Sequence, residues 1–331
     1  MSLNVGVVGV GVRGRHSLEQ MLAKVDGVRI GLVSMYPATN PVLLEGFTEE
    51  GARKYAANLG AQYVEDWREV VHSPDVDIIS VMVEPGVAYP VIMEAIGAGK
   101  HVLCDKPMVK SPAEAEAVRQ AVAESGLQLM VFLWGRYLPP FRDLKKQVEE
   151  GAIGNPIAVS MEFLMANGPL AGFTASAEYL QGYGGGDLVT FGCYGVDYIC
   201  WLLGEPQALQ ARSYPYFYPD YQAVGMDSFG FLGIEFKNGG IGNLITGRTP
   251  GSFPIIRVNV TGETGVLRAE ANLKAPGLVS GAQMEMVTDF ISSIRSNKPI
   301  GNLPGSLEGC YVARVLSGAY EAIGTERTVL V

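Results

Sequence analysis

The chain has 331 residues, of which 48% are hydrophobic and 18% are charged, and its formal net charge is -9. That length suits two domains of about 100 to 200 residues each, and the composition is that of a globular protein. An acidic chain without a block of lysines and arginines lacks the cationic surface that nucleic acid needs, and no apolar run approaches the ~20 residues of a membrane helix. We therefore expect neither nucleic acid nor a membrane as a partner.

Residues 1–130 alternate apolar runs of strand length with amphipathic stretches, which is the pattern of βαβ units on a parallel sheet. The segment 37–47 is long for a connection in such units, so we interpret it as a surface insertion. This half of the chain predicts a doubly wound Rossmann domain. Its strands are predicted at 3–10, 28–35, 78–83, 101–104 and 127–133, and its helices at 17–25, 49–59, 87–97 and 112–124.

Beyond Pro139-Pro140 the pattern changes to longer strand-like segments, which imply an antiparallel or mixed sheet. Residues 131–331 therefore predict an α+β domain with a large, mostly antiparallel open sheet, within an α/β fold overall. A helix is predicted at 141–150, strands at 156–165, 229–236, 241–246 and 255–260, and helices packed on one sheet face at 192–203, 282–296 and 307–323.

The sequence GVGVRG at 9–14 leaves the first predicted strand and enters the first predicted helix. Glycines there permit a tight turn and let the backbone approach a pyrophosphate at the helix N-terminus. The alternative is that the glycines only turn the chain. We predict dinucleotide binding by Gly9, Gly11, Val12, Arg13 and Gly14.

The second predicted strand ends at Ser34, where an acidic residue would accept a hydrogen bond from the ribose 2′-hydroxyl of NAD. Without that carboxylate, no repulsion acts on a 2′-phosphate, and Ser34 could donate to one. Arg13, Arg53 or Lys54 would supply a cation, although each is equally explained as a solvated surface charge. The pattern favours NADP over NAD, and both are candidates.

The tripeptide Asp105-Lys106-Pro107 follows a predicted strand, at the sheet edge where doubly wound folds place their chemistry. Pro107 restricts Lys106 to an extended conformation and allows a cis peptide bond, which would direct the lysine side chain. We predict that Lys106 is catalytic and contacts the cofactor. The alternative is an ordinary surface lysine.

The GxGxxG sequence, AGKHVLCDKP at 98–107 and GGGDLVTFGCYGVD at 184–197 together resemble the glucose-fructose oxidoreductase/inositol dehydrogenase/MocA family, and the similarity runs nearly end to end. The resemblance implies a nicotinamide-dependent dehydrogenase or reductase acting on CH–OH groups of a sugar, polyol or cyclic diol. It implies that Lys106 contacts substrate and nicotinamide, and that Asp105 replaces the usual glutamate of the motif at the cofactor site. Glu84 and Pro85 are implied to border the nicotinamide ribose.

The family's second catalytic segment commonly has an aspartate and then Gly-x-His-x-x-Asp, whereas this chain has Thr190, Tyr194 and Asp197 at the three side-chain positions. The tyrosine resembles the glucose-fructose oxidoreductase and dihydrodiol dehydrogenase branch, in which tyrosine is the acid/base. We predict that Tyr194 exchanges a proton with the substrate oxygen, with Lys106 as the cation that favours its phenolate. The alternative for Tyr194 is a core tyrosine.

Further substrate-binding residues are predicted around these motifs. Asp197 follows Tyr194 by three residues and shares its helical face, so it either binds a substrate hydroxyl or pairs locally. Arg136 and Tyr183 are included for their place near the motifs. Thr190 is included for its place in the motif, although its chemical role there is unexplained.

Two other functions are open. A cofactor-binding sensor or regulator without turnover is favoured by Thr190, and a redox-assisted glycosidase is a third hypothesis, whereas Lys106 together with Tyr194 favours the dehydrogenase. An exposed face of the C-terminal sheet would promote association, so we expect a homodimer or homotetramer through that sheet. Three histidines and four cysteines without a CxxC pair predict no metal site, and reduced thiols in a cytoplasmic enzyme.

Overall fold

The computed structural model describes residues 2–10, 18–36, 48–165, 182–250 and 254–331. The chain divides into two compact units, Met1–Phe132 with Met284–Leu307, and Leu133–Gln283 with Glu308–Val331. The sequence prediction had placed all of 131–331 in the second domain. Residues 284–307 group with the first unit instead, where the Val131 amide donates to the Pro304 carbonyl at 2.8 Å.

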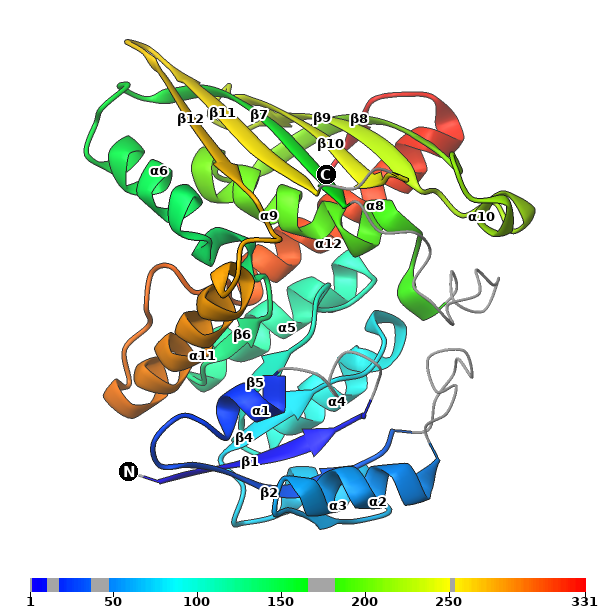
Figure 1. Ribbon diagram of the computed structural model, residues 1–331, viewed down its shortest axis with the longest axis vertical. Helices are drawn as coiled ribbons and strands as arrows, with labels where there is room; N and C mark the ends of the chain where they lie inside the picture. The colour runs from blue at the N-terminus through cyan, green and yellow to red at the C-terminus, as the bar shows by residue number, and fades with distance from the viewer. Residues whose placement is uncertain (1, 11–17, 37–47, 166–181, 251–253) are drawn as a thin grey trace. The chain divides into compact units, whose positions relative to one another are not determined.

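The first unit is built on a six-stranded, entirely parallel sheet in the order β3-β2-β1-β4-β5-β6 (Figure 1). Its inner strands are almost continuously apolar and buried, as a sheet covered on both faces requires. This is the strand order of a Rossmann fold, so the predicted fold of this half is confirmed. The strands are β1 (Leu3–Val8), β2 (Val28–Ser34), β3 (Gln62–Tyr63), β4 (Ile78–Val81), β5 (His101–Cys104) and β6 (Leu129–Val131).

Helices connect these strands, and their ends follow local capping rules. The Thr48 side chain accepts a hydrogen bond from the Gly51 amide at the start of α2, and Ser111 with Pro112 begins α5, although the Ser111 side chain makes no capping bond. The predicted insertion at 37–47 lies outside the described residues. The helices are α1 (Leu18–Leu22), α2 (Glu49–Asn58), α3 (Trp67–His72), α4 (Pro85–Gly97), α5 (Pro112–Ser125) and, entering from the second unit, α11 (Leu278–Ser296).

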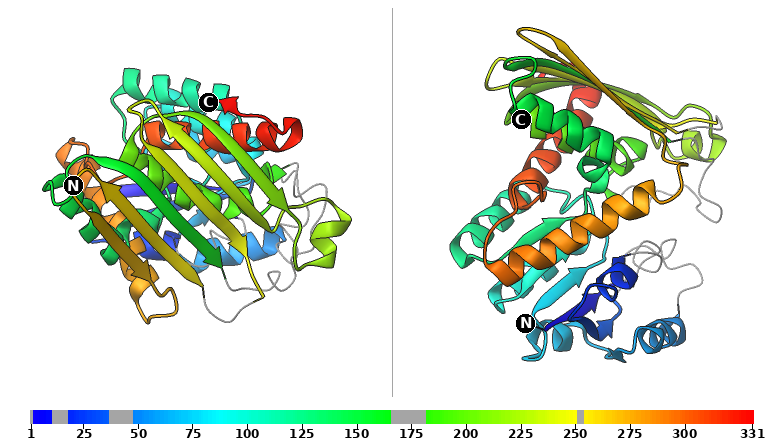
Figure 2. Two further views of the ribbon diagram at one scale, coloured as in Figure 1. Left: turned by 90° about the horizontal axis from the view of Figure 1, so that it is seen from above. Right: turned by 60° about the vertical axis from the view of Figure 1, so that its left-hand side comes forward.

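The second unit contains a seven-stranded sheet in the order β12-β11-β7-β10-β9-β8-β13, seen from above in the left view of Figure 2. Among the described strands of this second sheet, only β7 and β10 pair in parallel, and the other pairs are antiparallel. The predicted mostly antiparallel sheet is therefore confirmed. The strands are β7 (Pro156–Met165), β8 (Pro206–Tyr214), β9 (Phe229–Phe236), β10 (Ile241–Arg248), β11 (Ile255–Gly262), β12 (Val266–Ala271) and β13 (Val329–Leu330).

Helices of this unit cover one face of the sheet (Figure 2). Gly195 lets α9 approach β10 closely, because an added Cβ there would lie 2.5 Å from the Leu244 side chain. The predicted helices at 192–203 and 307–323 correspond to α9 and α12. The helix predicted at 282–296 was wrongly assigned to this face, since its residues from Met284 onward belong to the first unit. The helices are η2 (Trp134–Tyr137), α6 (Pro139–Glu149), α8 (Asp187–Thr190), α9 (Gly192–Leu203), α10 (Pro219–Ala223) and α12 (Ser306–Thr325).

Across the part of the chain that the structure describes, none of the helices has both the length and the apolar character needed to cross a membrane.

Candidate active site

The chain turns tightly at the carboxyl end of β1. Gly9 has φ +90°, and a Cβ added to it would lie 2.6 Å from the Met82 backbone oxygen. Its amide donates to the Ser34 carbonyl at the end of β2, at 2.9 Å. Only glycine fits this close approach, and the ends of three neighbouring strands meet here, as a dinucleotide loop requires. The other predicted loop residues, Gly11, Val12, Arg13 and Gly14, lie outside the described residues.

The end of β2 is occupied by internal hydrogen bonds. Ser34 is fully buried, and its hydroxyl lies within hydrogen-bonding distance of the Met35 carbonyl (3.0 Å) and the Glu65 carbonyl (3.2 Å). Arg53 on α2 is bound by the Glu49 carboxylate at 2.6 Å and the Glu65 carboxylate at 3.1 Å. Both side chains would have to exchange these partners to contact a 2′-phosphate.

The predicted lysine lies at the carboxyl end of β5. Lys106 is 3% exposed, so the alternative of a surface lysine is wrong. The Lys106–Pro107 peptide bond is cis, and the Asp105 carboxylate accepts a hydrogen bond from the Lys106 amide at 2.8 Å. Glu84, also buried, precedes Pro85 at the start of α4, after β4. Gly9, Ser34, Glu84 and Lys106 thus all follow parallel strands and lie along one edge of the sheet.

Tyr194 lies in the first turn of α9, in the second unit, and is almost fully buried. Its ring stacks on Phe163 of β7, with centroids 5.4 Å apart and planes 11° apart. On η2, Trp134 contacts the same ring in a tilted arrangement, with ring centroids 5.0 Å apart, and Gly135 lies beside Tyr194. These aromatic neighbours hold the phenol ring in one orientation, which suits a positioned acid/base as well as a core residue.

Asp197, one turn further along α9, is paired with Arg136. The Arg136 Nε donates to Asp197 Oδ2 at 2.9 Å, and Nη2 donates to Oδ1. Burial raises the pKa of Asp197, against the opposing attraction of Arg136. The local pairing that the sequence left open for Asp197 is present, and the substrate role of both residues stays a prediction.

The glycine-rich segment before α8 and the first turn of α8 are held by acidic residues for which no role was predicted. Asp187 forms a buried, two-pronged ion pair with Arg248, with both nitrogen-to-oxygen distances 3.0 Å. Asp227 accepts from the backbone amides of Gly186 (3.2 Å) and Leu188 (2.7 Å). Only the position of Asp187 within the GGGD sequence could have indicated these contacts. The predicted Thr190 and Tyr183 are both buried close to this segment in the chain.

Metal ligands do not gather at these positions. Among the described residues, no group of three or more His, Cys, Asp or Glu side chains is arranged to hold a metal ion.

The Rossmann sheet with its glycine turn and buried lysine, joined to a unit with a large sheet, defines a dinucleotide-binding oxidoreductase. Residues 3–133 match the model of the oxidoreductase family with an NAD-binding Rossmann fold, and residues 141–268 match the GFO/IDH/MocA C-terminal domain. The chain therefore belongs to the GFO/IDH/MocA family of oxidoreductases, which confirms the resemblance found in its motifs.

Individual relatives are dehydrogenases. Levoglucosan dehydrogenase of Pseudarthrobacter phenanthrenivorans is 27% identical over 220 residues, which cover 63% of this chain but only 53% of that protein. The scyllo-inositol 2-dehydrogenase (NAD(+)) of Bacillus subtilis is 25% identical over 265 residues, 78% of this chain and 71% of the relative. The crystal structure of scyllo-inositol dehydrogenase from Lactobacillus casei, with bound NAD(H) and scyllo-inositol, superposes with a TM-score of 0.82 at 20% identity, covering 100% of this chain and 99% of that one. This last likeness shows a shared fold.

Proposed function

We propose that the protein is an NAD(P)-dependent dehydrogenase that transfers hydride between nicotinamide and a hydroxyl or carbonyl carbon of a sugar, polyol or cyclic diol. The observation that carries the proposal is a buried lysine at the carboxyl end of β5, in a chain whose two halves match one oxidoreductase family. The dehydrogenases among its relatives favour turnover over the alternative of a sensor or regulator.

The first unit fits a dinucleotide. Gly9 provides a turn that any side chain would block, and the predicted cofactor residues Ser34, Glu84, Pro85 and Asp105 follow neighbouring strands of one parallel sheet. We propose that these residues, with the loop at 11–14, hold the cofactor at this sheet edge.

For the choice of cofactor we propose NADP ahead of NAD, because Ser34 puts no negative charge where a 2′-phosphate would lie. Arg53 is exposed, and its guanidinium would have to leave Glu49 and Glu65 to bind that phosphate. Titration with NADPH and NADH, followed by nicotinamide fluorescence, measures the preference. NADH binding roughly tenfold or more tighter than NADPH, a difference of about 1.4 kcal/mol, would overturn the proposal.

The proposed chemistry divides between two side chains. Bound nicotinamide supplies the hydride acceptor or donor. In the direction of oxidation Tyr194 accepts the hydroxyl proton, and in reduction it returns the proton to the carbonyl oxygen. The positive charge of Lys106 favours the phenolate and assists the proton transfer. Of the predicted substrate residues, Tyr183 and Thr190 are proposed to lie around the substrate, whereas Asp197 and Arg136 are paired with each other.

Two substitutions test these roles once a substrate has been found. Lys106→Ala is expected to lower kcat at least ~100-fold while leaving cofactor affinity unchanged, because the lysine acts in the transition state. Tyr194→Phe is expected to remove the pH dependence that the phenol gives to kcat, with the ring still stacked on Phe163. Lys110→Ala, an exposed lysine four residues after Lys106, is the matched control. Unchanged turnover in Lys106→Ala would refute the catalytic role of that lysine.

We further propose that the protein assembles as a homodimer or homotetramer through the open face of the second unit's sheet. Phe231 and Ile241 are 42% and 57% exposed and line a hollow on that face together with Asn243 and Thr261. Sedimentation of the wild type and of Phe231→Glu measures the assembly. A cytoplasmic location is proposed because the four cysteines of the sequence show neither a CxxC pair nor the spacing of a disulfide framework.

A further inference from the structure

A buried cluster in the second unit joins η2, α9 and α12. Arg136 is 0% exposed and Asp197 is 1% exposed, and both oxygens of the Asp197 carboxylate accept hydrogen bonds from the guanidinium. The remaining nitrogen, Nη1, lies 3.7 Å from a carboxylate oxygen of Glu308 and has no hydrogen-bond partner among the described residues. When a planar guanidinium binds a carboxylate with two parallel hydrogen bonds, the orientation of the carboxylate is fixed as well as its distance.

The same short helix also forms the surroundings of Tyr194. Trp134 of η2 contacts the Tyr194 ring at 5.0 Å, and a Cβ added to Gly135 would lie 3.6 Å from the Tyr194 Cβ. Arg136 then reaches Asp197, three residues after Tyr194 on α9. Two residues of η2 therefore hold the turn of α9 that carries the proposed acid/base, Trp134 by packing and Arg136 by an ion pair, and Gly135 between them lies beside the same tyrosine.

We propose that Arg136 and Asp197 are positioning residues that fix the place of Tyr194, and that they are not ligands of the substrate. Both side chains are closed to solvent, and the one guanidinium nitrogen without a hydrogen bond, Nη1, lies beside the Glu308 carboxylate, so they present no group to a molecule that enters from solution. A shift of about 1 Å in a catalytic group can cost about 100-fold in rate, which gives the pair a direct effect on turnover. The kinetic part of this inference rests on the proposed function.

Arg136→Lys and Asp197→Asn test the inference, and each removes the two-pronged ion pair with little change in volume. The expected result is a fall in kcat of about 30- to 100-fold, with substrate KM and cofactor Kd changed less than about threefold. A rise of substrate KM of about tenfold or more with kcat unchanged would overturn the inference, because it would show that the pair binds substrate directly. Asp197→Asn keeps the shape of the side chain and is the variant to use where Arg136→Lys does not fold.

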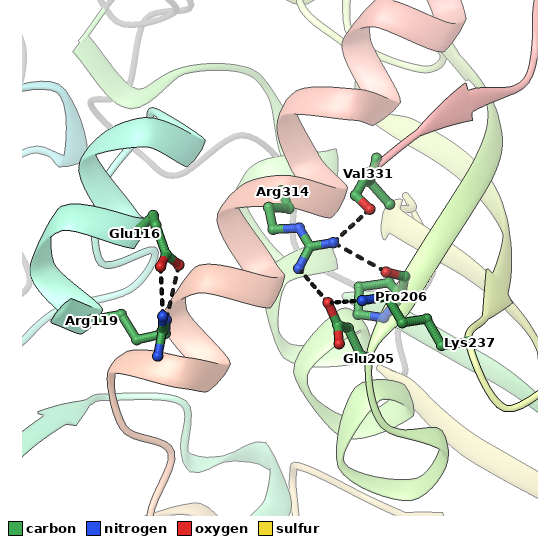
Figure 3. A network of polar contacts seen from close by, with 7 residues as sticks. All are labelled: Glu116, Arg119, Glu205, Pro206, Lys237, Arg314 and Val331. Carbon is green, nitrogen blue, oxygen red and sulfur yellow. Dashed lines mark hydrogen bonds and ion pairs between the residues drawn. The ribbon is translucent and has the colours of Figure 1, made fainter. Parts of the chain in front are cut away.

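Arg314→Lys is the matched control. Arg314 is also an arginine of the second unit, and its guanidinium contacts the Glu205 carboxylate at 3.2 Å and the Pro206 carbonyl at 3.3 Å, with a further bond to the Val331 carbonyl (Figure 3). Its replacement removes three contacts of a partly exposed arginine that does not bond to the turn that carries Tyr194. Turnover of this variant is expected to stay within about threefold of the wild type. An equal loss of kcat in control and test variants would overturn the inference, because it would show a general effect of stability.

A second readout does not depend on turnover. The near-ultraviolet circular dichroism of the wild type minus that of Tyr194→Phe isolates the signal of the phenol, which stacks on Phe163 and contacts Trp134. We expect this difference to shrink by at least half when it is measured in an Arg136→Lys background, and to persist in an Arg314→Lys background. An undiminished difference would overturn the inference. If the difference shrinks while even the wild type turns over no substrate, the proposed function fails and the positioning role of the pair stands.

Discussion

Glu19 offers the sharpest test of the electrostatics of the first unit. It lies in α1, is completely buried, and accepts hydrogen bonds from the Tyr55 hydroxyl at 2.9 Å and the Ser80 hydroxyl at 3.4 Å. Burial raises the pKa of this carboxyl from 4.5 to about 7, because these two hydrogen bonds do not replace the lost hydration. We predict that Glu19→Gln stabilises the protein at alkaline pH.

The sign and size of this change in stability follow from the difference in proton binding between the folded and unfolded chain. A carboxyl with a raised folded-state pKa holds its proton more tightly when folded, so the free energy of unfolding falls as pH rises from 4.5 to about 7 and stays low above that. Each unit of pKa corresponds to about 1.4 kcal/mol, so the full effect is about 3 kcal/mol. Relative to the wild type, Glu19→Gln should therefore gain about 2 to 3 kcal/mol between about pH 5 and about pH 9.

Urea unfolding followed by circular dichroism at several pH values measures this difference. Glu50→Gln removes an exposed carboxyl on α2 and is the control, because it changes the net charge equally without touching a buried site. Parallel pH dependence of stability in the wild type and in Glu19→Gln would refute the reasoning.

Two further predictions concern residues whose geometry is unambiguous. Gly9→Ala is expected to weaken dinucleotide binding at least ~10-fold by fluorescence titration, since the added Cβ would lie 2.6 Å from a backbone oxygen, whereas Gly60→Ala, with a similar positive φ but open space around it, is expected to keep its affinity. Arg248→Met is expected to lower the free energy of unfolding by about 3 to 5 kcal/mol, because it leaves the Asp187 carboxylate buried without its partner, and Arg257→Met on the exposed sheet surface is expected to cost less than about 1 kcal/mol. Wild-type affinity in Gly9→Ala, or equal losses in the two arginine variants, would contradict these expectations.

The fold was largely predictable because inner strands of the first sheet, such as β4 and β5, are buried apolar runs, whereas buried and more exposed positions alternate along β7. His101–Cys104 and Pro156–Met165 were placed with their observed bounds, whereas the two-residue β3 is too short to leave a pattern. The edge-region strands β8 and β12 were missed because polar and charged residues interrupt them. The return of residues 284–307 to the first unit depends on tertiary packing, which no local pattern encodes.

The candidate site, like the fold, was predictable from the sequence only in part. The Asp105-Lys106-Pro107 sequence predicted that Lys106 follows a parallel strand in an extended conformation, because a proline restricts the backbone of the residue before it. Arg136 and Asp197 were each selected from the sequence, but their ion pair joins residues 61 positions apart and could not be inferred. The buried position of Thr190 gives no physical account of why a threonine replaces the family's usual aspartate.

The most direct test of the proposed dehydrogenase is to incubate the protein with NADP or NAD and a panel of sugars, inositols and cyclic diols, and to record the absorbance of reduced nicotinamide. We predict that at least one hydroxylated ring yields reduced cofactor, and that Lys106→Ala abolishes the signal. If the protein binds cofactor but forms none of its reduced form with any member of the panel, hydride transfer to or from such substrates is contradicted and a cofactor-binding regulator becomes the better account.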